Sequence, residues 1–356
     1  MKVIRVLVVD DSAFMRRVIS DIINAQSDMR VVGTARNGED AIEKIPQLKP
    51  DVVTLDIEMP VMDGISTLRR IMEWKLPVIM LSSLTQVGAE MTVKALQLGA
   101  VDFVPKPSGT ISLDMANIGD DIVDKIRIAA LARPQLKRAV VDQPSRRVGW
   151  GKETLRPVPG RSTDLTKLVL IGASTGGPRA LQKVLSSLPG DLDAGVLIVQ
   201  HMPAGFTRSL AERLNSFSAL RVKEAEHGEP ICDGTAYIAP GGCHLQVMRS
   251  QEQLLVNLSN DVFDTRHCPS VDVMLESVAR EFWGTMVVVI LTGMGKDGSQ
   301  GLIKIREKGA RVIAEDASTC VVFGMPRTAI ETGCVNKIAA LPDIAVEIEK
   351  MLKVGR

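Results

Sequence analysis

A serine stands in the glycine-rich turn Gly-Ala-Ser-Thr-Gly-Gly at residues 172–177. The apolar run 168–171 precedes it, so the pattern predicts a sharp strand-to-helix bend that exposes the hydroxyl of Ser174. Backbone amides that open the following helix face the same place and can stabilise a developing oxyanion. The motif indicates a serine hydrolase, although a turn of this kind can equally bind phosphate or allow close packing.

A serine nucleophile needs a base, and His201 is the best placed of the four histidines. It follows the predicted strand Gly195–Gln200, the next strand after the one that carries the serine. We expect His227 to lie in a solvated loop, because its neighbours are polar. His244 and His267 could face the substrate, but a structural role is the stronger expectation for each.

The third member of such a set is an acid that orients the imidazole, and Asp297 is the best candidate. It lies in the stretch 291–298, Leu-Thr-Gly-Met-Gly-Lys-Asp-Gly, after the strongly apolar strand predicted at 285–291. The alternative is that Asp297 caps a helix beginning at Gly298. Thr175 and Met294 are the candidate oxyanion or substrate residues. The chain order Ser-His-Asp differs from that of the α/β-hydrolases, so the turn is not a lipase signature.

Three carboxylates gather in the first half of the chain. Asp10 and Asp11 follow the strand predicted at Ile4–Val9, and Asp56 follows the strand predicted at 52–55. At one sheet edge they would repel each other unless a hard cation bound, and Mg²⁺ fits because it prefers oxygen ligands. Ser82 and Lys106, at two further strand ends, supply a hydroxyl and a positive charge for phosphate.

The elements that must position these residues alternate between short apolar strands and amphipathic helices in both halves of the chain, which is typical of doubly wound α/β sheets. At 356 residues the chain is long enough for two domains. We predict a flavodoxin-like domain at 1–125 and a mainly parallel-sheet α/β domain at 165–350, with an antiparallel extension between 221 and 259. The proline- and arginine-rich residues 126–164 hold a helix end and a linker, because the regular pattern stops near Arg133.

Composition narrows the class of protein. The chain is 45% hydrophobic and 24% charged, with no run long enough to span a bilayer and no signal peptide, so we expect a cytoplasmic monomer without membrane insertion. Its net charge of +1 gives no electrostatic case for nucleic-acid binding. Five cysteines without a CxxC pair predict reduced thiols and no structural zinc.

The first half resembles the receiver domain of two-component response regulators. The resemblance rests on residues 8–12, 55–64, 81–83 and 106–107. It implies that Asp56 accepts a phosphoryl group from a histidine kinase while Asp10, Asp11 and Asp56 hold Mg²⁺. It further implies that Ser82 and Lys106 sense the phosphate and that Phe103 is the rotating aromatic of the switch.

The second half is similar to the catalytic domain of the chemotaxis protein-glutamate methylesterase (CheB) family. The resemblance rests on residues 171–177, 200–203, 237–241, 266–272, 291–298 and 322–326. It implies a metal-free Ser-His-Asp hydrolysis of glutamate γ-methyl esters on the cytoplasmic helices of chemoreceptors, with methanol as product, and deamidation of receptor glutamines. Two alternatives remain at this stage: a phosphorylation-gated hydrolase of another ester or amide, and a response regulator whose output only binds a partner.

Overall fold

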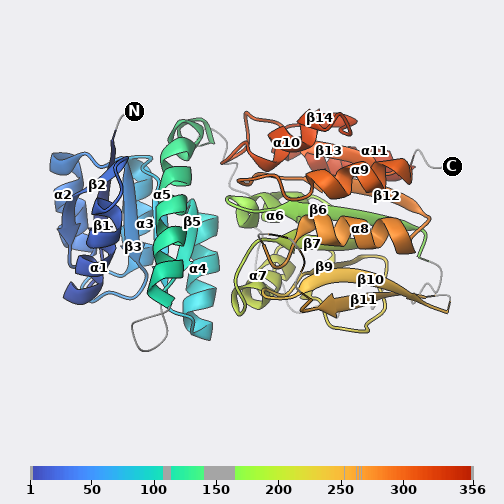
Figure 1. Ribbon diagram of the computed structural model, residues 1–356, viewed down its shortest axis with the longest axis horizontal. Helices are drawn as coiled ribbons and strands as arrows, with labels where there is room; N and C mark the ends of the chain where they lie inside the picture. The colour runs from blue at the N-terminus through green and yellow to red at the C-terminus, as the bar shows by residue number, and fades with distance from the viewer. Residues whose placement is uncertain are drawn as a thin grey trace.

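The computed structural model describes residues 3–106, 114–139, 165–251, 253–261, 263, 265 and 267–353. Two α/β domains follow one another along the chain (Figure 1). The amino-terminal domain contains β1 (Ile4–Val9), α1 (Ala13–Asn24), β2 (Met29–Ala35), α2 (Gly38–Leu48), β3 (Val52–Asp56), α3 (Gly64–Glu73), β4 (Val78–Ser82), α4 (Gln86–Leu98), β5 (Asp102–Pro105) and α5 (Asp114–Ala139).

The sheet of the amino-terminal domain has the parallel order β2-β1-β3-β4-β5, as expected for a flavodoxin-like fold. Parallel strands buried on both faces need continuous apolar runs, and residues 6–9 of β1 are fully buried. Helix α5 continues to Ala139, beyond the point near Arg133 where the regular pattern was expected to end. Residues 140–164, most of the predicted linker, lie outside the described residues.

The carboxyl-terminal domain is built on a parallel sheet of order β14-β13-β12-β6-β7-β9-β8. Its elements are β6 (Lys167–Ala173), α6 (Gly177–Leu185), β7 (Gly195–Gln200), α7 (Phe206–Asn215), β8 (Arg221–Glu224), β9 (Thr235–Ile238), β10 (His244–Ser250), β11 (Gln253–Ser259), α8 (Val271–Glu281), β12 (Thr285–Ile290), α9 (Ser299–Glu307), β13 (Arg311–Glu315), α10 (Met325–Glu331), β14 (Lys337–Ala339), the short 3₁₀ helix η1 (Leu341–Asp343) and α11 (Ile344–Lys353).

The antiparallel extension is smaller than the sequence predicted. Strands β8 and β9 run parallel to each other and to β7, inside the main sheet. Only β10 and β11 pair antiparallel, as a separate two-stranded unit. The alternation of residue types over 221–259 signalled strands correctly but could not give their direction, because direction depends on how each connection crosses the sheet.

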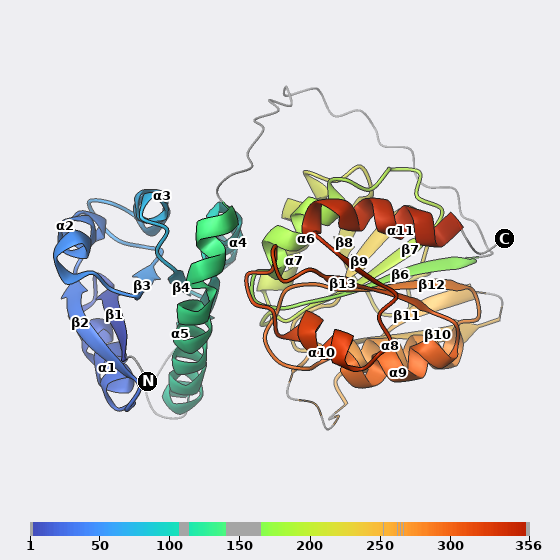
Figure 2. The ribbon, with the colours of Figure 1, turned by 90° about the horizontal axis from the view of Figure 1, so that it is seen from above.

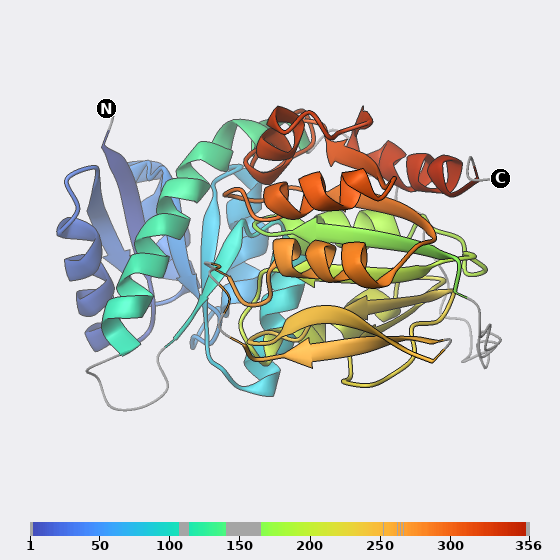
Figure 3. The ribbon, with the colours of Figure 1, turned by 45° about the vertical axis from the view of Figure 1, so that its right-hand side comes forward.

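The two domains pack against each other through α4 and β5 of the first and α6 and α7 of the second (Figures 1, 2 and 3). Leu96 and Phe103 on one side and Phe206 and Leu210 on the other belong to the same buried apolar cluster. The rings of Phe103 and Phe206 lie 4.5 Å apart between centroids. Within the described residues, no helix is long and apolar enough to cross a membrane.

Candidate active site

The ends of β6 and β7 bring Ser174 and His201 to the same edge of the sheet. In the parallel register Ala173 is the partner of Gln200, so the serine and the histidine are the next residues on adjacent strands. The side-chain amide of Gln200 donates to the carbonyl oxygens of Ser174 at 3.0 Å and His201 at 3.2 Å. No role was predicted for Gln200, although a buried glutamine that ends an apolar strand is a signal for one.

Close packing explains the glycines around Ser174. Gly176 has φ +81°, a conformation that favours glycine and turns the chain into α6. Gly293, from the loop after β12, lies so near the serine that an added Cβ would be 2.7 Å from the Cβ of Ser174. The amide of Ser174 donates to the carbonyl of Thr292 at 3.1 Å. The turn is therefore held from both neighbouring strands.

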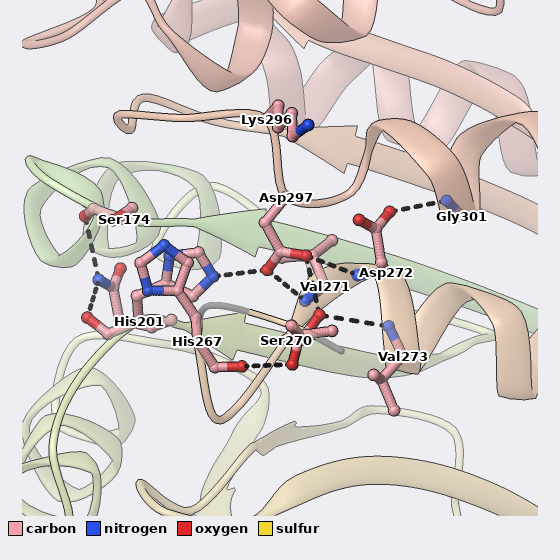
Figure 4. Close-up of polar contacts among 12 residues, drawn as sticks. Ser174, His201, His267, Ser270, Val271, Asp272, Val273, Lys296, Asp297 and Gly301 are labelled. Carbon is pink, nitrogen blue, oxygen red and sulfur yellow. Dashed lines mark hydrogen bonds and ion pairs between the residues drawn. The ribbon is translucent and has the colours of Figure 1, made fainter. Parts of the chain in front are cut away.

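His201 is paired with Asp297, and both side chains are about nine-tenths buried. Nε2 of the imidazole lies 2.7 Å from Oδ2 of Asp297 (Figure 4). Because Asp297 accepts at Nε2, that nitrogen carries the proton in the neutral ring and Nδ1 is left as the basic one. Nδ1 is buried and has no hydrogen-bond partner among the described residues. It therefore makes no hydrogen bond with the Ser174 hydroxyl. The hydrogen bond between a catalytic serine and its histidine is often long in free enzymes and shortens when substrate binds.

The amino terminus of α8 holds Asp297. Its two carboxylate oxygens accept hydrogen bonds from the hydroxyl of Ser270 at 2.8 Å and from the amides of Val271 at 2.7 Å and Asp272 at 3.1 Å. Burial alone would raise the pKa of Asp297, but the hydrogen bond and charge of His201 and these amides outweigh it and hold the pKa below the usual range. The carboxylate is therefore ionised at neutral pH.

The alternative role for Asp297, as the cap of the helix that follows it, is wrong. Gly298 is the N-cap of α9 and offers no side-chain cap. The carboxylate of Asp272 takes that place, since it accepts from the amide of Gly301 at 2.7 Å (Figure 4). Burial raises the pKa of Asp272 to about 6. Asp272 thus ties the start of α8 to the start of α9 and fixes the loop that carries Asp297.

The three other histidines lie in different surroundings. His267 stacks on His201, with ring centroids 4.3 Å apart and planes 21° apart. His244 is 2% exposed and touches Phe263 edge-on, and burial lowers its pKa. His227 is exposed, as predicted, and its Nδ1 accepts from the amide of Leu258. Only His267 contacts the His201 ring in this way among the described residues.

Thr175 and Met294 flank Ser174 in different surroundings. Met294 is 45% exposed in the loop between β12 and α9. Thr175 is buried beneath the amino-terminal domain, and its hydroxyl donates to Oδ2 of Asp102 at 2.5 Å. Within the described residues, neither backbone amide donates to another protein group. The predicted oxyanion role requires amides that are unpaired in this way.

The acidic residues of the amino-terminal domain form a second site. Ligand oxygens of Asp10, Asp11 and Asp56 all lie within 4.8 Å of one another. The ammonium group of Lys106 is 2.9 Å from Asp10 and 2.8 Å from Asp56. Burial raises the pKa of Asp56 to about 6, although Lys106 opposes the shift. One lysine leaves this oxygen-only set with excess negative charge, which fits a divalent cation such as Mg²⁺.

Ser82 and Phe103 connect the acidic site to the domain interface. The hydroxyl of Ser82 is fully buried and bonds to α4, donating to the carbonyl of Gly88 and accepting from Thr92 at 2.6 Å. Its hydroxyl therefore faces α4 in this structure. Phe103 is 2% exposed and lies against Phe206 of the other domain. Both candidate sensing residues thus contact elements that form the interface.

Fold and sites together define a receiver-type domain joined to an α/β domain that carries a serine, a histidine and an aspartate at one sheet edge. The family model "Response regulator receiver domain" matches residues 6–116, and the model "CheB methylesterase" matches residues 169–348. The chain therefore belongs to the CheB methylesterase family.

Similar proteins cover the whole chain. A protein-glutamate methylesterase/protein-glutamine glutaminase of Syntrophomonas wolfei is 52% identical over 98% of this chain and 99% of its own length. The Bacillus subtilis protein of that name is 48% identical over 99% of both. The crystal structure of the Thermotoga maritima CheB methylesterase catalytic domain is 44% identical, covers 53% of this chain and 98% of that one, and has a TM-score of 0.51. The α/β architecture expected for both halves is confirmed.

Proposed function

We propose that this chain hydrolyses glutamate γ-methyl esters on the cytoplasmic helices of chemoreceptors, releasing methanol, and that it deamidates receptor glutamines. It does so in the cytoplasm as a monomer, gated by phosphorylation of Asp56. The names of the full-length relatives support both reactions. The observation that carries the chemistry is the His201–Asp297 pair beside the Ser174 turn, with Nδ1 of the imidazole left without a partner among the residues that the structure describes.

In the proposed mechanism, Ser174 attacks the side-chain carbonyl of the ester while Nδ1 of His201 takes the hydroxyl proton. Asp297 orients the ring through Nε2 and stabilises the imidazolium that forms. His201 then returns the proton to the leaving methoxide, methanol departs, and the acyl-enzyme remains. Water, activated by His201, hydrolyses the acyl-enzyme and regenerates Ser174. An amide follows the same course more slowly, because ammonia is a poorer leaving group than methanol.

The amides of Thr175 and Met294 stabilise the tetrahedral intermediate in this proposal. A pre-positioned N–H donor of this kind is worth about 3–4 kcal/mol to the transition state. Thr175 follows the nucleophile directly, and Gly293 brings the loop with Met294 against Ser174. The side chain of Met294 is 45% exposed, so receptor helices could contact it.

The gating proposal follows from the domain interface. In the described structure β5 and α4 cover the nucleophile turn, and a small cavity between the domains is lined by Gly99 and Val101 on one side and Gly176 and Pro178 on the other. Arg213 of α7 also donates to the side chain of Gln97 at 2.8 Å. A receptor helix could not reach Ser174 along this side until the amino-terminal domain moves away.

Phosphorylation would weaken that interface through Ser82. A histidine kinase of the chemotaxis system is the proposed phosphodonor, and Asp10, Asp11 and Asp56 would hold Mg²⁺, which neutralises charge during phosphoryl transfer. A phosphoryl group on Asp56 attracts the hydroxyl of Ser82. That hydroxyl must then leave Gly88 and Thr92 on α4, the helix that packs on α7.

Methanol release from receptor membranes carrying labelled methyl groups tests the proposal. We expect release by the wild-type chain, stimulation by a small phosphodonor with Mg²⁺, and no release by Ser174→Ala. The control is Ser187→Ala, which removes an exposed hydroxyl just after α6, away from the site. Unchanged release by Ser174→Ala would refute the mechanism, and a fluorophosphonate that fails to label Ser174 would favour a binding module.

A further inference from the structure

Glu315 is a buried acid that the mechanism above does not use. It ends β13 and its side chain has no exposed surface. One carboxyl oxygen accepts from the backbone amide of Thr292 at 2.8 Å, and the other has no hydrogen-bond partner among the described residues. Among the described residues, the other groups that act on Glu315 are Asp316, the hydroxyl of Thr319 and the thiol of Cys320, and none of them is a cation.

Thr292, the partner of Glu315, lies at the centre of the nucleophile turn. Its carbonyl accepts from the amide of Ser174 at 3.1 Å, and its hydroxyl donates to the carbonyl of Thr175 at 3.0 Å. The same hydroxyl accepts from the amide of Val322 at 3.0 Å. Thr292 therefore joins the nucleophile turn, the 293–295 loop and the segment after β13. Its own amide has Glu315 as acceptor, which makes the position of Thr292 depend on that carboxyl.

The surroundings of Glu315 favour the neutral acid. Burial costs an ionised carboxylate more hydration than the Thr292 amide, the Thr319 hydroxyl and the Cys320 thiol return. A neutral carboxyl still accepts from Thr292 through one oxygen. In agreement with this geometry, burial raises the pKa of Glu315 to about 7.

We propose that Glu315, in its neutral form, is a positioning residue for the nucleophile: by accepting from the Thr292 amide it fixes the turn that carries Ser174 and the loop that carries Met294. This role rests on the proposed function of Ser174. Glu315 touches neither substrate nor the reacting atoms, so its effect on the reaction passes through Thr292.

Two substitutions distinguish the effect of the hydrogen-bond acceptor of Glu315 from the effect of its charge. Glu315→Gln keeps an oxygen acceptor in a neutral side chain of the same shape, whereas Glu315→Leu removes the acceptor and leaves the Thr292 amide unpaired. Both are made in the full chain, phosphorylated with a small phosphodonor and Mg²⁺. The measurements are the rate at which a fluorophosphonate labels Ser174, the kcat and KM of methanol release, and phosphorylation at Asp56 as a control for folding of the other domain.

We expect Glu315→Gln to label and turn over within about twofold of wild type near pH 6, and Glu315→Leu to lose about 10-fold or more in kcat with little change in KM. The ratio of wild-type to Gln rate should fall as the pH rises through about 7, because only the wild-type side chain then acquires a buried charge.

Three results would overturn the proposal. Full kcat in Glu315→Leu would remove the positioning role. A Gln variant as slow as the Leu variant would show that the ionised form is required. A wild-type to Gln ratio that rises with pH would refute the neutral form even if Glu315→Leu fails to fold, because the ionised side chain would then be the active one. Normal labelling of Ser174 without methanol release would instead count against the proposed substrate and leave the role of Glu315 standing.

Discussion

Replacing Thr175 by valine should weaken the docking of the amino-terminal domain over Ser174. Valine keeps the shape of threonine but lacks the hydroxyl that donates to Asp102 at 2.5 Å across the domain interface. Asp102 keeps its ion pair with Lys125 and its contact with the amide of Phe103, so the amino-terminal domain retains its own structure. The expected result is a higher rate of methanol release by the unphosphorylated chain.

The size of the effect follows from the environment of that hydrogen bond. Thr175 is 5% exposed, the Asp102 side chain is 16% exposed, and the acceptor is ionisable. A hydrogen bond to a charged group contributes about 1.5–3 kcal/mol, which corresponds to about 10- to 150-fold in the equilibrium between docked and undocked domains. The rise ends when the domains are fully undocked, so the isolated carboxyl-terminal domain sets the upper limit.

The assay compares methanol release by the unphosphorylated full chain with that of the isolated carboxyl-terminal domain beginning near residue 164, each with and without Thr175→Val. Dividing the full-chain rate by the isolated-domain rate removes any direct effect of Thr175 on catalysis. We expect the wild-type ratio to be well below one and the Thr175→Val ratio to approach one. Equal ratios would refute the role of this hydrogen bond, and an isolated domain no faster than the whole wild-type chain would refute inhibition by covering.

Four further outcomes are expected. Ser174→Ala and His201→Ala should each lower kcat by orders of magnitude, and the double variant should be scarcely worse than either; additive losses would contradict a shared mechanism. Asp297→Ala should be less severe in the same methanol assay, because Asp297 orients the ring without transferring its proton. Asp56→Asn, or removal of Mg²⁺ by chelation, should abolish stimulation by a phosphodonor while leaving the basal rate. In denaturant titrations, Asp297→Asn should lack part of the wild-type loss of stability below about pH 4, because a depressed carboxyl pKa stabilises the folded state only above the unfolded pKa.

Local patterns predicted much of this protein. Apolar runs that end in Asp10, Asp56, Ser174 and His201 fix both the strands and the edge at which these side chains lie, because parallel strands share one carboxyl edge. The strands predicted at Ile4–Val9 and Gly195–Gln200 have those bounds in the structure. The strand order followed from the flavodoxin-like pattern in the first domain but not from any pattern in the second.

Only the tertiary structure decided which distant groups meet. Asp297 is held by the start of α8 and not by its own helix, the direction of β8 and β9 depends on crossovers, and Thr175 contacts Asp102 across 73 residues. The sequence does not distinguish Glu315 from other acidic residues at strand ends, because its proposed positioning role depends on its burial and its hydrogen bond with Thr292. A sequence pattern reports what each segment prefers, whereas hydrogen bonding and desolvation between segments arise only once the chain has packed them together.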